Sequence, residues 1–211
     1  STIAYGSEIV EESIDAKDLL QRHQLPTDNF HLHIGRIQPD NHVFEILDAA
    51  VNSGETLVTV GDYTTRYGRK LKATFPEPNI IYAGTIYDKT ILNALRTRAT
   101  FYLHGHSVGG TNPALLEAMA AQTLIIAHDN QFNKSVINEN DYYFNCPSSL
   151  AILLKDGEII KNKSAGLFCV HQRGKKYLYR HLRGSEYKHL LITPGFTGGH
   201  NYLTSSRFFL N

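Results

Sequence analysis

The most informative segment of this chain is Tyr102-Leu-His-Gly-His-Ser-Val-Gly-Gly-Thr-Asn-Pro-Ala-Leu-Leu-Glu-Ala-Met-Ala120, in which a strand runs into a glycine-rich turn and then into a helix. Asn112 suits the N-cap of that helix and Pro113 suits its first position. The apolar residues that follow recur at helical spacing and form one stripe: Leu115, Leu116, Met119 and Ala120. The glycines before the helix, Gly105, Gly109 and Gly110, allow a tight turn and a close approach of the backbone to a ligand.

This turn is a candidate anion site, because free N–H groups at a helix start attract phosphate. Glu117 lies one turn into the helix, and helical side chains lean toward the N-terminus, so Glu117 can reach back over the same place. A carboxylate repels bare phosphate, and its better task there is to accept hydrogen bonds from the hydroxyls of a sugar or ribose. The same glycines would also suit a strand-to-helix turn that has only a packing role.

Composition predicts a globular chain of one domain or slightly more. It has 211 residues, of which 42% are hydrophobic and 19% charged, and no apolar run approaches the roughly 20 residues of a membrane helix. No signal peptide is visible at Ser1, which could be a processed end. Cys146 and Cys169 lack CxxC spacing, which favours a reducing compartment without a metal site, although a single disulfide stays an alternative. We therefore expect a cytoplasmic protein.

Charge divides the chain into two parts. Residues 1–160 hold 12 Lys/Arg against 19 Asp/Glu, whereas residues 161–211 hold 9 against 1. We expect a Rossmann-like domain over 1–160 and a basic segment of uncertain structure over 161–211. A basic segment can bind acidic lipid headgroups or nucleic acid, or can pack on its own domain. Packing or a peripheral contact with the inner membrane surface is favoured, because no nucleic-acid motif is present.

Short β-rich runs alternate with amphipathic helices along residues 1–160. Strands are expected at 30–35, 56–60, 79–83, 100–103, 122–127 and 142–145, and helices near 19–23, 43–53, 67–73, 89–96, 112–120 and 148–154. Residues 128–133 read as a polar turn, and 177–191 as a further helix. This alternation predicts an α/β fold, a Rossmann-like three-layer sandwich with a mostly parallel sheet and right-handed crossovers.

Ligands of such sheets bind beyond the carboxyl ends of the strands. Gly35 and Arg36 follow the first strand, and Arg36 could pair with phosphate or lie free in solvent. His104 and His106 follow the fourth strand, where they could donate to phosphate or a leaving group, or only shape the turn. The loops after the second and third strands add Gly61, Gly84 and Tyr87.

Two histidines share one face of the first strand. Phe30, Leu32 and Ile34 point to one face of the predicted sheet, which leaves His31 and His33 on the other. A metal would need a third ligand, and none is nearby in sequence, so polar or partly buried histidines are the preferred interpretation.

These loops together resemble the C-terminal, donor-binding domain of GT-B fold glycosyltransferases, and among them the bacterial rhamnosyltransferase-like group. The resemblance covers about Ile3 to Leu154. It is carried by Ile-Ala-Tyr-Gly6, by Gly35-Arg36 with Pro39-Asp40-Asn41, by Tyr82-Ala-Gly84 with Ile86-Tyr87-Asp88, and most strongly by His104 through Met119 with His128-Asp-Asn130.

The resemblance implies specific roles. Arg36 and Glu117 are the expected catalytic residues. Arg36 and the amides of Gly110–Asn112 hold the donor diphosphate, and Glu117 matches the second acid of the family's Glu-x7-Glu pattern, which holds ribose or sugar hydroxyls. The expected donor-binding residues are Gly35, Gly61, Gly84, Tyr87, His106, Gly109, Gly110, Thr111 and Asn112. Two features depart from the family: Gly109 stands where the first acid belongs, and Asp40 and Asn41 lie where many relatives carry a lysine. The basic segment also differs from the usual closing helix of the family.

The resemblance further implies a dTDP- or UDP-sugar as substrate, with no cofactor and no metal. The expected function is to bind the nucleotide sugar in a glycosyltransferase that moves a hexose or a deoxyhexose such as rhamnose to a surface-glycan or lipid-linked acceptor. An N-terminal domain would supply the acceptor site, so this chain alone should be catalytically incomplete. Two other hypotheses stay open: a non-catalytic nucleotide-binding or regulatory module, and a membrane-surface adaptor acting through the basic segment.

Overall fold

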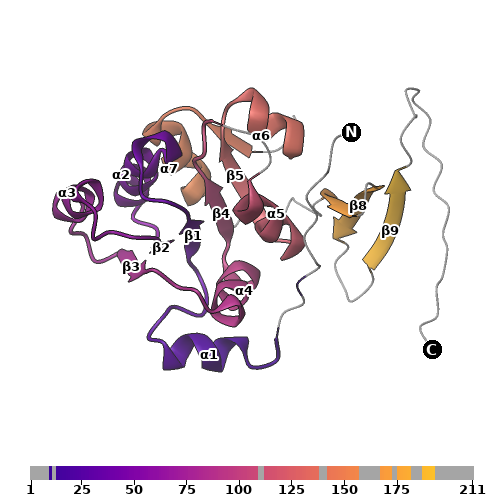
Figure 1. Cartoon of the computed structure of the whole chain (residues 1–211), viewed down its shortest axis with the longest axis horizontal. Coiled ribbons are helices and arrows are strands. Elements are labelled where there is room, and N and C mark those ends of the chain that lie inside the picture. The colour runs from indigo at the N-terminus through magenta and orange to yellow at the C-terminus, as the bar shows by residue number, and fades with distance from the viewer. Residues whose placement is uncertain are drawn as a thin grey trace.

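The computed structural model describes residues 10, 13–108, 112–137 and 142–156, together with the backbone of residues 167–172, 175–181 and 187–192. Six parallel strands form one sheet in the order β3-β2-β1-β4-β5-β6. Figure 1 labels β1 to β5 of this sheet. The strands are β1 (His31–Ile34), β2 (Leu57–Val60), β3 (Ile80–Gly84), β4 (Phe101–His104), β5 (Leu124–His128) and β6 (Tyr142–Phe144). The predicted Rossmann-like α/β fold is confirmed.

Helices cover both faces of this sheet (Figure 1). One apolar cluster joins the sheet to α2 (Val43–Ser53), α3 (Arg66–Thr74) and α7 (Pro147–Lys155). The second joins the opposite face to α1 (Ala16–Arg22), α4 (Lys89–Arg98) and α5 (Pro113–Ala120), with the end of α6 (Gln131–Val136) packed against it. Phe30 and Leu32 belong to the second cluster, as their alternation predicted. His31 and His33 therefore point toward the α2 side, and both are buried.

Short polar side chains set the helix starts. The hydroxyl of Thr65 accepts from the Gly68 amide at 3.0 Å and caps α3, and the Asp88 carboxylate accepts from the Thr90 amide at 2.8 Å and caps α4. Gly54 ends α2 with a φ of 76°, a left-handed conformation that glycine adopts without strain. These boundaries agree with the sequence-based ones within a few residues.

Two sequence-based assignments were wrong. Residues 131–136 form the helix α6 instead of continuing a polar turn, because Asn130 accepts from the Asn133 amide at 2.9 Å and acts as an N-cap. The helix expected over 177–191 is two strands, β8 (Lys175–His181) and β9 (Tyr187–Ile192), which join β7 (Leu167–Gln172) in an antiparallel sheet. Tyr177 and Tyr179 favour strand, and Gly184 interrupts any helical run between them and β9.

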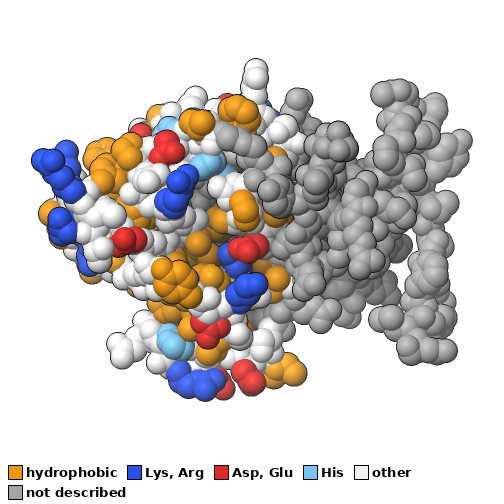
Figure 2. Space-filling view, viewed as in Figure 1, with side chains coloured by type: hydrophobic (Ala, Val, Ile, Leu, Met, Phe, Trp, Pro, Cys, Tyr) orange, Lys and Arg blue, Asp and Glu red, His pale blue; other side chains and the backbone are white. Residues whose placement is uncertain are grey.

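The helix α3 carries a group of basic side chains. Four of them are exposed within this helix, namely Arg66, Arg69, Lys70 and Lys72. Figure 2 shows blue side chains at the α3 end of the molecule and further ones near its middle and its lower edge, interspersed with red ones. Within the described residues, no helix has the length and apolar character needed to cross a membrane.

Candidate functional site

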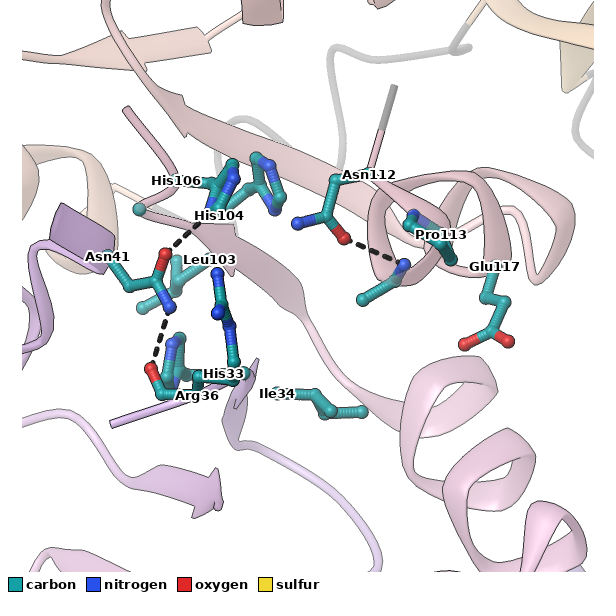
Figure 3. Close-up of a pocket in the computed structure, with 13 residues that line it drawn as sticks. His33, Ile34, Arg36, Asn41, Leu103, His104, His106, Asn112, Pro113 and Glu117 are labelled. Carbon is teal, nitrogen blue, oxygen red and sulfur yellow. Dashed lines mark hydrogen bonds between the residues drawn. The ribbon is translucent and has the colours of Figure 1, made fainter. Parts of the chain in front are cut away.

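A cavity of about 530 Å³ lies at the carboxyl ends of β1 and β4, the two central strands at which the winding of the sheet reverses (Figure 3). Parallel sheets of this type bind ligands at that position. Two segments of the chain supply all the described lining residues, namely His33, Ile34, Gly35, Arg36 and Asn41 from the first, and Leu103, His104, Gly105, His106, Asn112, Pro113, Ala114 and Glu117 from the second. Both expected catalytic residues, Arg36 and Glu117, are therefore brought to one cavity.

Arg36 supplies the cavity with an available positive charge. It follows β1 directly after Gly35, its side chain is exposed, and it extends toward the middle of the cavity in Figure 3. No ion pair joins its guanidinium to an acid in the described part of the chain. Such a planar cation can form paired hydrogen bonds to a phosphate.

Glu117 supplies a carboxylate on the α5 side of the cavity. It is 43% exposed and forms an ion pair with Nη2 of Arg96, a residue of α4 that is only 3% exposed. Arg96 also donates from Nη1 to the Asn93 side chain at 3.2 Å. This buried arginine fixes the carboxylate and offsets its charge. Sequence reasoning missed it, because Arg96 reads as an ordinary basic residue near the end of a helix.

The start of α5 differs from the expectation of free N–H groups. The Asn112 side chain accepts from the Ala114 amide at 2.9 Å, and the Asn112 carbonyl accepts from Leu115 and Leu116 at 3.1 and 3.2 Å. Pro113 has no N–H group. The first turn of α5 itself is therefore already satisfied, and any amides offered to an anion would come from the turn before it. Gly109, Gly110 and Thr111, which belong to that turn, lie outside the described residues.

Asn41 joins the two segments of the cavity. It is 5% exposed, donates from Nδ2 to the Arg36 carbonyl at 2.7 Å, and contacts Nδ1 of His106 through Oδ1 at 2.5 Å. An amide oxygen only accepts, so the Nδ1 atom of His106 carries a proton. Neutral His106 therefore accepts hydrogen bonds at Nε2, and it donates from that atom only when protonated.

The loop that carries His106 is held from behind by two asparagines. Asn130 and Asn133 donate from their side-chain amides to the His106 carbonyl at 3.1 and 3.0 Å, and Asn133 also donates to the His128 carbonyl at 2.8 Å. Asn130 and Asn133, which follow the fifth strand, therefore support the site loop, and neither lines the cavity.

Two further histidines at the cavity are kept neutral by burial. Burial lowers the pKa of His33 to about 4, and burial together with the nearby His106 and His33 lowers the pKa of His104 to about 3. Nε2 of His104 is buried with no hydrogen-bond partner in the described part of the chain. Among the described residues, no group of three or more His, Cys, Asp or Glu side chains could hold a metal ion.

Three of the expected donor-binding residues do not line this cavity. Gly61 packs so tightly that a Cβ there would lie 2.5 Å from the Gly35 carbonyl oxygen, which makes it a packing glycine beneath the site loop. Gly84 has a φ of 70° at the end of β3, and Tyr87 beyond it is 89% exposed. Gly35, His106 and Asn112 do line the cavity.

Comparison with known proteins agrees with this arrangement. The family model "Glycosyl transferases group 1" matches residues 15–168, so the chain belongs to the group 1 glycosyl transferases. Within that family it is the domain that binds the nucleotide-sugar donor. No curated protein sequence matches the chain.

Solved structures share the fold at low sequence identity. The C-terminal domain of the group 1 glycosyl transferase LpcC from Francisella tularensis has 19% identity and a TM-score of 0.57, over 75% of this chain and 89% of that one. The pneumococcal O-GlcNAc transferase GtfA, in complex with UDP and GlcNAc, has 14% identity and a TM-score of 0.57 over 75% of this chain. An α,α-trehalose-phosphate synthase (UDP-forming) from Burkholderia vietnamiensis has 13% identity, a TM-score of 0.52 and 69% coverage of this chain. This chain spans 32% and 39% of the last two proteins.

Proposed function

We propose that the cavity holds a nucleotide sugar, with the diphosphate between Arg36 and the turn before α5 and the ribose or sugar hydroxyls on Glu117. The observation that carries this proposal is the placement of a guanidinium and a fixed carboxylate, from segments about 80 residues apart, at one cavity. The guanidinium has no ion-pair partner among the residues that the structure describes. A cation matches the diphosphate, and a carboxylate accepts hydrogen bonds from hydroxyls.

Charge development explains how this arrangement would assist transfer. As the glycosyl group leaves, negative charge grows on the diphosphate, and Arg36 together with the positive end of α5 would stabilise it without a metal ion. Glu117 is already paired with Arg96, so its charge should repel the departing diphosphate less than a free carboxylate would. The pairing also leaves carboxylate lone pairs for hydroxyls.

The rest of the enzyme is proposed by the same reasoning. Residues 1–160 would form the nucleotide-sugar unit and 161–211 a separate basic segment that can contact a membrane surface. A preceding N-terminal domain would bind a surface-glycan or lipid-linked acceptor, and the sugar would be a hexose or a deoxyhexose such as rhamnose, delivered from a dTDP- or UDP-linked donor in the cytoplasm. The related GtfA structure contains UDP, which supports testing UDP first.

Calorimetric titration of UDP, dTDP and GDP, each with and without its sugar, tests the proposal. Arg36→Ala should weaken binding of the tightest nucleotide by about tenfold or more, since a hydrogen-bonded ion pair to phosphate is lost. Arg66→Ala, an exposed arginine on α3, is the matched control and should bind like the wild type. Glu117→Gln should lower the affinity for the nucleotide sugar, or for the nucleotide through its ribose, and should leave the affinity for inorganic pyrophosphate unchanged. Failure of all three nucleotides to bind at millimolar concentration would refute the proposal.

A further inference from the structure

A chain of three side chains leads from the α3 side of the sheet to His33. The hydroxyl groups of Tyr63 and Thr59 lie 2.7 Å apart, and the Thr59 hydroxyl lies 3.1 Å from Nδ1 of His33. All three residues are buried, with 6%, 0% and 3% exposure respectively. Burial raises the pKa of the Tyr63 hydroxyl, so the phenol keeps its proton.

Only one direction of hydrogen bonding satisfies every proton in this chain. The Tyr63 hydroxyl has one partner among the described residues, the Thr59 oxygen, so its proton points there. The Thr59 proton must then point to Nδ1 of His33, the other partner of that hydroxyl. The reverse direction would leave the buried phenol proton without an acceptor among the described residues, and an unsatisfied buried donor is destabilising. Nδ1 therefore accepts, and the proton of neutral His33 lies on Nε2.

The opposite nitrogen of His33 lies at the cavity. His33 is one of the lining residues (Figure 3), and no described side chain or backbone group pairs with Nε2. A Cβ placed on Gly35 would lie 3.2 Å from this Nε2 atom, so the nitrogen lies beside Gly35, which also lines the cavity. The same loop continues directly into Arg36.

We propose that His33 presents a fixed Nε2–H donor on the floor of the cavity, and that this donor binds a phosphate oxygen of the nucleoside diphosphate. The proposal rests on the proposed function for the identity of the ligand. A group that only donates suits the phosphate oxygens of a nucleotide sugar, which carry lone pairs and no protons at neutral pH, and Arg36 directs the phosphates to this side of the cavity. Neutral His106 offers an acceptor at Nε2, so the two imidazoles differ in what they can bind.

Nitrogen-15 NMR of the 211-residue chain, labelled with ¹⁵N at its histidines, tests the tautomer of His33 without any ligand. Long-range ¹⁵N–¹H spectra at pH 7 should show His33 as the neutral Nε2–H form, assigned by loss of its signals in His33→Gln. In Thr59→Val, whose folding is checked by its melting curve, both tautomers should become populated. An Nδ1–H form or an imidazolium in the wild type at pH 7 would overturn the inference, whatever the chain binds.

Titration then tests the ligand of this donor. His33→Phe should weaken the tightest-binding nucleotide and inorganic pyrophosphate alike, by about tenfold or more. His33→Gln, which keeps an N–H group near the Nε2 position, should recover most of that loss. His31→Phe is the matched control, because His31 is buried on the same face of β1 and does not line the cavity.

Two outcomes would contradict the role in phosphate binding. Equal affinity of wild type and His33→Phe for pyrophosphate would exclude a phosphate contact, and a loss restricted to the nucleotide sugar would assign the donor to a hydroxyl instead. If the wild type binds none of the nucleotides and no pyrophosphate, the proposed function fails and the phosphate contact fails with it. In that case the NMR measurement still decides whether His33 is the Nε2–H tautomer, because it needs no ligand.

Discussion

Replacing Gly105 with alanine should separate the two segments that form the cavity. A Cβ on Gly105 would lie 2.0 Å from the carbonyl oxygen of Asn41 and 3.0 Å from Cδ1 of Ile46. Ordinary contacts are 3.4–4 Å long, so the carbonyl of Asn41 must move. Overpacking of a well-packed region costs about 1–3 kcal/mol. The displaced backbone is the Asp40 to Asn41 turn, whose Asp40 carbonyl accepts from the Ser107 amide at 3.1 Å and the Ser107 hydroxyl at 2.7 Å.

Differential scanning calorimetry measures the loss of stability as a lower melting temperature, Tm. For a chain of this length each 1 kcal/mol lowers Tm by about 2–4 °C, so a cost of about 1–3 kcal/mol should make Gly105→Ala melt about 2–12 °C below the wild type. Gly54→Ala is the control: nothing lies within 4 Å of its added Cβ, but its φ of 76° costs about 1 kcal/mol for a residue with a side chain. That control should melt only a few degrees lower and keep its nucleotide affinity, whereas Gly105→Ala should lose affinity as well.

The decisive result is which of the two variants has the lower melting temperature. If Gly105→Ala melts at or above the temperature of Gly54→Ala, the close packing of the two segments is not as the structure places it. If Gly105→Ala is destabilised but binds nucleotide like the wild type, the Asp40 to Asn41 turn does not contribute to the site. Asn41 would then not be needed to hold the two segments of the cavity together for binding.

Two further predictions concern buried ionisable side chains. Burial lowers the pKa of His31 and His33 to about 4 and of His104 to about 3, while these histidines titrate near 6.5 in the unfolded chain, so the unfolded state binds more protons between these values. The free energy of unfolding should fall as pH drops below about 6.5, by about 1.4 kcal/mol per pH unit for each histidine. Urea unfolding at pH 7, 6 and 5 measures this free energy, which should depend less steeply on pH in His31→Phe than in the wild type. An equal pH dependence in the two proteins would contradict the burial of His31. Glu117→Gln should cost about 1–2 kcal/mol because Arg96 loses its charged partner, and adding Arg96→Met should cancel part of that cost; additive losses in this double-mutant cycle would show that the pair contributes nothing.

Much of the fold could be predicted from the sequence because its signals are local. The apolar spacing over Val43 to Val51 and the β-rich run Thr56 to Val60 each specify an element, and Gly54 between them marks the boundary. The same reasoning failed over residues 177–191, where Tyr and Leu at mixed spacing fit either a helix or a strand. Which strand they pair with, and hence which form they take, depends on residues elsewhere in the chain.

The site was predictable only in part. Arg36 and Glu117 were identified because each follows a strand or opens a helix at the expected edge of the sheet. Their partners were not, since Arg96 reaches Glu117 across 21 residues and Asn41 reaches His106 across 65. No local pattern encodes such contacts. The position of Tyr63 beside Thr59 likewise depends on how α3 packs on the sheet.

The bridges between Asp40 or Asn41 and the His106–Ser107 loop have a consequence for folding kinetics. They join residues 65–67 positions apart, so the cavity does not exist until this long-range loop has closed. A partly folded chain with intact local helices would still lack the site. A ligand that binds only the closed form adds its binding free energy to that form alone. Such a ligand should slow unfolding while leaving the folding rate nearly unchanged, which would make the lifetime of the native state depend on nucleotide concentration.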